Sequence, residues 1–247
     1  MIIPIIQHDI RRVLRNAKTW YCLATLQVLL AIIFNWLLTN FLKTQAITQA
    51  VHYGITEEVI HPFYAWFALL VLLFMPMLCA QMLCAEKQHG TIINYYCAPI
   101  SATKVILAKF FILIISLTTM LVFFSIMPLS IIISGALDWG QYFATIVGVF
   151  LLLCSATAIC LSISAFMGNI MRANLLMFFV ITGFVLLEWA ALYAGEYAMF
   201  LQGFGLLKPL KGFLAGIISV RAASYYLLIM LSFLCLGGWG YTRKWQQ

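Results

Sequence analysis

The side chains of this chain that could act as nucleophiles, general bases or metal ligands do not form a recognisable catalytic set. The four histidines, His8, His52, His61 and His89, all fall outside the long apolar runs, so the sequence predicts no serine–histidine pair within them. The motifs G-x-S-x-G, H-E-x-x-H and G-x-x-x-x-G-K-[ST] do not occur. The last of these cradles nucleotide phosphates. We therefore expect a chain that is not itself an enzyme and binds no ATP in the P-loop manner.

The seven cysteines point to no metal or redox centre. Cys97 lies between two apolar runs, and the others lie within them, where a free thiol packs as a small apolar residue. No pair has the spacing of a zinc site with a histidine. Paired membrane histidines that could hold haem are missing too. We expect neither a disulfide nor a metal nor a bound cofactor.

One carboxylate lies in an apolar run. Glu188 is followed by Trp189 near the end of the fifth run, and an ionisable residue within a membrane segment is costly and is first treated as a functional candidate. A role in a substrate path or in coupling is one interpretation. Anchoring at the membrane interface, or an ion pair with a lysine of the following loop, is the other.

The most polar and basic internal segment is Glu86-Lys87-Gln88-His89-Gly90-Thr91 and the loop that it opens, which closes near Lys104 and Lys109. It separates two long apolar runs in a chain of which 9% is charged. Such a loop is suited to docking a partner. The alternative is a solvated connection without a specific role.

The elements that must position these residues are membrane helices. The mean hydropathy is +1.05 and 65% of residues are hydrophobic, whereas a soluble domain is apolar at about half its positions. About 20 apolar residues span a bilayer as a helix. We predict one all-α polytopic membrane domain over 1–247, and the lengths of its runs argue against a barrel. The six predicted spans are 21–42, 63–84, 109–134, 142–166, 174–194 and 222–241.

Lysine and arginine orient these spans, because such residues concentrate in cytoplasmic segments. Both termini are therefore predicted to be cytoplasmic, and the net charge of +7 is read as topological bias and not as a nucleic-acid surface. The predicted cytoplasmic side carries Arg11, Arg12, Arg15, Lys18, Lys87, Lys104, Lys109, Arg172, Arg243 and Lys244, and the other side carries Lys43, Lys208, Lys211 and Arg221.

Three further segments have patterns of their own. Residues 4–18 alternate apolar and basic faces at helical spacing, which predicts an amphipathic helix in the inner interface. Residues 200–220 are apolar but broken by glycines and Lys208-Pro209, which predicts two short re-entrant or interfacial helices between spans five and six. Their lysines are expected to snorkel to lipid headgroups. The small residues of the fourth span, 155–165, predict close helix packing.

The chain resembles the membrane subunits of type-2 ABC exporters, and in particular the compact permeases of the gliding-motility and nitrous-oxide-reductase-maturation group. The resemblance covers nearly the whole chain. It rests on the turn from Glu86 to Ile92 followed by Ala98-Pro99-Ile100-Ser101 and Lys109-Phe110. Two later matches run from 135 to 169 and from 211 to 225. Asp9 stands where the group commonly has glutamate.

This resemblance implies a homodimer in a bacterial inner membrane, with each chain contacting a separate ATP-binding cassette subunit that holds ATP and Mg²⁺. The loop 85–104 would contain the coupling helix, and the helix 4–18 would lie beside it. The first and fifth spans would line the dimer interface. The residues so implied are Glu86, Lys87, Gln88, His89, Gly90, Thr91, Pro99, Arg11, Arg12 and Arg15 at the ATPase contact, and Asn35, Thr182 and Glu188 in a substrate path.

Two functions from different classes remain open at this point. The first is export of a lipid, glycan, peptide or hydrophobic compound. The second is mechanical transmission to a periplasmic or other envelope partner without a translocated substrate. The short predicted outer loops leave little surface for a large partner, which favours export.

Overall fold

Helices account for every regular element that the structure describes. It is a computed structural model that describes residues 17–47, 56–88, 102–131, 138–191, 203 and 205–245. The predicted all-α class is confirmed, whereas residues 4–16 of the predicted interfacial helix lie outside the described ranges. In chain order the elements are α2 (Ala17–Ile47), the π-helical turn η1 (Thr56–Ile60), α3 (His61–Gln88), α5 (Ala102–Leu129), α6 (Trp139–Phe166), α7 (Ile170–Ala191), α9 (Lys208–Leu214) and α10 (Val220–Trp245).

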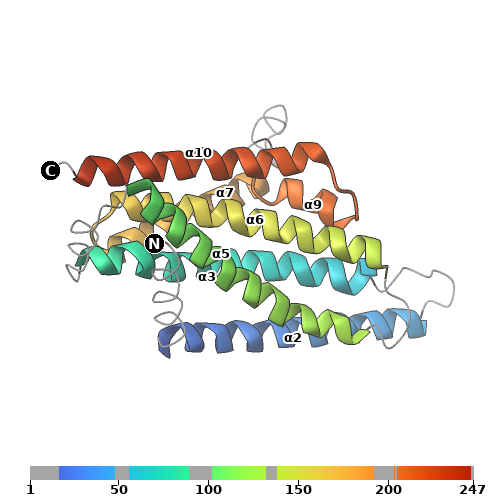
Figure 1. Cartoon of the computed structure of the whole chain (residues 1–247). Helices are drawn as coiled ribbons and strands as arrows, with labels where there is room; N and C mark the ends of the chain where they lie inside the picture. Colours follow the sequence, from blue (N-terminus) through green and yellow to red (C-terminus); the bar gives the residue numbers. More distant parts are fainter. Residues whose placement is uncertain are drawn as a thin grey trace.

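Six of these helices are long and apolar enough to cross a bilayer, which confirms the six predicted spans. α2, α3, α6 and α10 run roughly along one direction and α5 crosses the bundle obliquely, while the short α9 lies at one end of it (Figure 1). The bounds differ most for α5, which begins at Ala102 and not at Lys109. Thr103 and Lys104 extend the helix past the apolar run, and hydropathy alone does not detect such an extension.

The centre of the bundle is α6. It contacts α3, α5, α7, α9 and α10, and 72% of its apolar membrane-spanning stretch is buried. Its run of small residues, including Ala156, Thr157 and Ala158, is fully buried, as the sequence predicts. The buried hydroxyl of Thr157 donates to backbone carbonyls of its own helix, so it leaves no unpaired donor in the core.

A buried hydroxyl cluster joins the three inner helices at the end of the bundle where α9 lies. Tyr64 at the start of α3 donates to Ser125 Oγ of α5 at 2.9 Å. Tyr142 of α6 donates to the backbone oxygen of Ser125 at 3.3 Å. Because all three residues are buried, these bonds hold α3, α5 and α6 in a fixed relation at this end.

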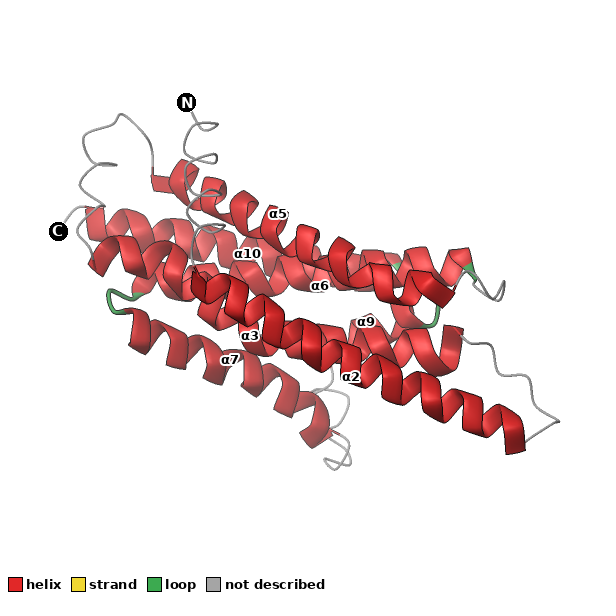
Figure 2. Ribbon diagram, turned by 90° about the horizontal axis from the view of Figure 1, so that it is seen from below, coloured by secondary structure: helices red, strands yellow, loops and turns green. Residues whose placement is uncertain are grey.

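The other three spans lie at the periphery. α2 packs mainly on α3, α7 on α3 and α6, and α10 mainly on α6. Of the apolar membrane-spanning stretch, 22% is buried in α2 and 17% is buried in each of α7 and α10. Figure 2 shows α7 at one edge of the bundle. Their exposed apolar faces are therefore available to lipid or to another helix.

Candidate functional site

The two helices that bound the polar loop are joined by a buried lysine. Lys109 of α5 is 0% exposed, and its Nζ donates to the backbone oxygen of Met82 in α3 at 3.0 Å. A hydrogen bond from a charged donor is stronger than one between neutral groups. A cation near the last turns of α3 also complements the negative end of the helix dipole. Lys109 therefore connects the end of α3 to the beginning of α5.

A thiol joins the same end of α3 to α6. Cys84 Sγ lies 3.2 Å from the hydroxyl of Ser164 and donates to the backbone oxygen of Ser164 at 3.5 Å. Cys84 and Ser164 are both fully buried. Together with Lys109, this contact gives the last turns of α3 polar connections to two other helices.

The residues predicted to contact an ATPase fall in or beyond the last turn of α3. Glu86, Lys87 and Gln88 belong to that turn, and Gln88 is exposed. The side chains of Glu86 and Lys87 are outside what the structure describes. So are the predicted contact residues His89, Gly90, Thr91, Pro99, Arg11, Arg12 and Arg15.

At the opposite end of the bundle, Glu188 of α7 forms an ion pair. Its Oε1 accepts a charge-assisted hydrogen bond from Lys211 Nζ of α9 at 2.8 Å. The Glu188 side chain is 9% exposed and that of Lys211 is 67% exposed. Glu188 Oε2 has no hydrogen-bond donor among the described residues. Of the alternatives for Glu188, the ion pair with a loop lysine is observed, and Lys211 does more than extend toward headgroups.

The position of Lys211 depends on how α9 is held. Lys208-Pro209 begins this helix, in the first turn where proline costs no hydrogen bond. Phe213 of α9 packs against Gly148 of α6, at a place where a Cβ on Gly148 would overlap the phenyl group. Gly216, with φ of +82°, ends the turn after α9. α9 is a short helix within 200–220, the segment for which two short re-entrant or interfacial helices are predicted; part of the preceding segment is outside the described residues, and the re-entrant or interfacial position stays a prediction.

A cavity of about 320 Å³ opens beside the ion pair, between α3, α7 and α9. Its walls are mostly apolar, and its polar side chains are Glu188 and Lys211. The sequence offered Glu188 and a lysine of the following loop as possible partners but not the cavity, because nothing in the sequence specifies that α9 folds back onto α6 beside α3 and α7. The apolar walls include Ala65, Trp66, Leu69, Trp189, Leu207 and Leu214.

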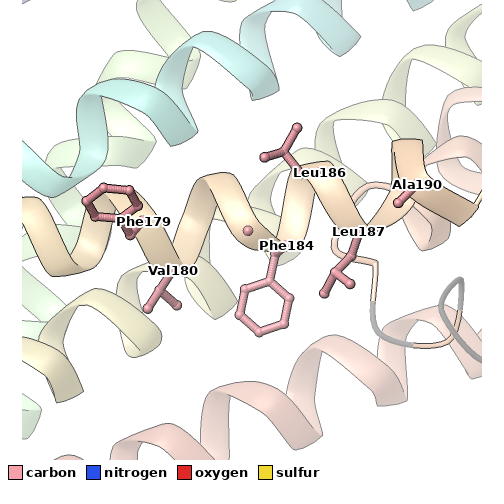
Figure 3. Close-up of a pocket in the computed structure, with 7 residues that line it drawn as sticks. Phe179, Val180, Phe184, Leu186, Leu187 and Ala190 are labelled. Carbon is pink, nitrogen blue, oxygen red and sulfur yellow. The ribbon is translucent and has the colours of Figure 1, made fainter.

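A second, more open groove of about 420 Å³ runs along α7 (Figure 3). Val180, Phe184 and Leu187 project to the same side of the helix in this view. A Cβ built on Gly183 would meet nothing within 4 Å. The other proposed path residues, Asn35 and Thr182, line neither groove. Asn35 is exposed on α2, and Thr182 is half-buried on α7.

Comparison with known proteins identifies one family. The family model described as ABC-2 family transporter protein matches residues 14–187. The matched region begins before the first span and extends almost to the end of α7. A search of curated proteins finds no match to the chain.

Proposed function

We propose, because the chain belongs to the ABC-2 transporter family, that two copies of it form the membrane part of an ATP-driven exporter. The family itself makes the chain a permease subunit of an ABC transporter and implies an ATP-binding cassette partner. The cargo that we propose is a lipid, glycan, peptide or hydrophobic compound. The motifs after Glu86 support placing it in the compact gliding-motility and nitrous-oxide-reductase-maturation group.

The observation that carries this proposal is the buried bond from Lys109 to Met82. A docking loop transmits force to membrane helices if its two ends are fixed to them. Lys109 bonds the beginning of α5 to the last turns of α3, and Cys84 bonds the same turns to α6. The two ends of the loop are therefore held to each other and to α6. ATP-driven closure of two cassette subunits would then move these helices when it displaces the loop 89–101.

The second copy would pack against α2 and α7. Both helices are largely exposed. The exposed amide of Asn35 on α2 accepts from Thr39 of its own helix, and it would gain a second partner if it faced another helix. On α7, the open space above Gly183 would admit a neighbouring helix at close range. We expect Gly183→Trp to lower the dimer fraction in size-exclusion chromatography with light scattering. Leu228→Trp, on the exposed face of α10, is the matched control.

The excess of basic residues supports an orientation with both termini in the cytoplasm of a bacterial inner membrane. The loop 89–101 would then face the cytosol, and α9 would lie in the outer leaflet. Labelling of single cysteines introduced at 90 and 208 by a membrane-impermeant maleimide tests this orientation. Labelling of position 90 in intact cells would show the opposite orientation, with the loop 89–101 outside the cytosol.

The decisive experiment is to purify the chain with its cassette subunit and reconstitute both in liposomes. We expect ATP-dependent transfer of a fluorescent amphiphile to the outer face, and its loss in Glu86→Lys at unchanged membrane insertion. Permease-dependent ATP hydrolysis without transfer of any of the four proposed cargo classes would favour mechanical transmission over export.

A further inference from the structure

The cavity between α3, α7 and α9 has the composition of a lipid site. Ala65, Leu69 and Leu214 provide apolar walls of the kind that accept an acyl chain. Trp66 and Trp189 line it and are exposed, and tryptophan is enriched where membrane hydrocarbon meets headgroups. The cavity is lined in part by α9, which lies at the end of the bundle away from the C-terminal end of α10 (Figure 1).

The polar side chains of this cavity present one charge of each sign. Lys211 has three N–H donors and uses one of them for Glu188 Oε1. Its side chain is mostly exposed, so its remaining donors are accessible to a ligand. Glu188, by contrast, is more than nine-tenths buried, and its Oε2 has no hydrogen-bond donor among the described residues.

An unsatisfied carboxylate oxygen in an apolar setting is costly, and a ligand that donates a hydrogen bond to it would remove that cost. The terminal torsion of glutamate is broad, so a rotation of the Glu188 carboxylate can turn Oε2 toward the cavity, and the mostly exposed Lys211 side chain can follow Oε1 as it moves. The ligand that complements both groups carries an anion for Lys211 and an N–H cation for Glu188.

We propose that this cavity binds a phospholipid with a primary-amine headgroup, of the phosphatidylethanolamine type. Its phosphate pairs with Lys211, its ammonium donates to Glu188, and one acyl chain covers the apolar walls. A choline headgroup has no N–H to donate, and a glycerol headgroup has no cation. The inference goes beyond the proposed export function, because it requires the membrane spans and the cavity but no transport.

The test is native mass spectrometry of the purified full chain with dioleoyl phospholipids that differ in headgroup. For the wild type we expect phosphatidylethanolamine to bind on the order of tenfold more tightly than phosphatidylcholine or phosphatidylglycerol, the contribution of one hydrogen bond to a charged group. Glu188→Gln should abolish this preference. Lys211→Met should weaken all three lipids, whereas the matched control Lys208→Met, on the same helix but outside the cavity lining, should change nothing.

Two further measurements locate the bound lipid and distinguish its binding from that of the headgroup alone. Phosphatidylethanolamine with brominated acyl chains should quench tryptophan fluorescence, and Trp66→Phe with Trp189→Phe should remove most of that quenching. Soluble phosphoethanolamine should not displace the lipid, because it has no chain to cover the apolar walls.

Equal binding of the three headgroups to the wild type would overturn the proposal. So would undiminished binding of all three lipids by Lys211→Met, a result that remains informative if Glu188→Gln does not fold. Displacement by soluble phosphoethanolamine would show a headgroup site without a lipid, and would overturn the proposal as well.

Discussion

Replacing Lys109 with methionine tests whether the bond between α3 and α5 transmits force. Methionine keeps an unbranched apolar side chain and removes the charge that donates to Met82 at 3.0 Å. A hydrogen bond from a charged group contributes about 1.5–3 kcal/mol. Losing it would change the equilibrium between joined and separated helix ends by about 10- to 100-fold. We expect permease-dependent stimulation of ATP hydrolysis to fall by about tenfold or more.

Stability should respond much less than coupling. Lys109 is 0% exposed, so its charge carries a desolvation cost that methionine removes, and replacement of buried ionic groups by apolar ones is often neutral. This gain opposes the lost hydrogen bond. We expect the thermal midpoint of the purified chain to shift by less than about 4 °C.

The assay measures ATP hydrolysis by the reconstituted complex, together with the amount of cassette subunit that co-purifies with the permease. The matched control is Lys104→Met, because Lys104 lies on the same helix but is exposed. Lys109→Met with full stimulation would refute the reasoning. An equal loss in Lys104→Met would do so too, because it would assign the effect to loop charge and not to the buried bond.

Three other predictions concern the loop, the packing of α9 and the ion pair. Gly90→Pro should insert into the membrane normally but lose stimulation of ATP hydrolysis in the same assay, and full stimulation would contradict a coupling role. Gly148→Ala should destabilise the chain by about 1–3 kcal/mol, because its Cβ would overlap Phe213, whereas Gly183→Ala, with open space around it, should have almost no effect on the thermal midpoint. Lys211→Met should lower that midpoint more than Glu188→Gln does, because it leaves a buried carboxylate without its cation, whereas the reverse change leaves an exposed lysine; the opposite order would show that Lys211 does not stabilise Glu188.

The spans could be predicted from the sequence because the bilayer sets a minimum apolar length that few soluble segments meet. The small residues of α6 likewise predicted its close packing, since short side chains let helices approach. Both inferences use properties of one segment at a time. They required no knowledge of which helices are neighbours.

Predicting that Lys109 is buried would require knowing which helices are neighbours. A lysine next to an apolar run is usually an interfacial residue, so the sequence suggested the end of a basic loop. One signal did point inward: Lys109 lies between Ala108 and Phe110, in a helix whose preceding turn is apolar at Val105 and Ile106. The partner of Glu188 was equally open, because either lysine of α9 could have faced it. The packing of Phe213 against Gly148 contributes to the placement of α9 that brings Lys211 to Glu188.

The polar contacts also indicate which helices would move together. At one end of the bundle, Tyr64 and Ser125 join α3 to α5, and at the other end Lys109 joins the same two helices. α6 is bonded to this pair at both ends, through Tyr142 and through Cys84. Among the described residues, the side-chain hydrogen bonds and ion pairs of α7 to other helices are confined to Glu188, which contacts Lys211 of α9. A displacement of the loop would therefore move α3, α5 and α6 as one body past α7, since among the described residues this motion strains a single polar link of α7, the ion pair of Glu188 with Lys211. Crosslinks between cysteines placed on α3 and α5 should then leave transport intact, whereas crosslinks between α3 and α7 should stop it. Loss of transport with the first pair would contradict a rigid inner unit.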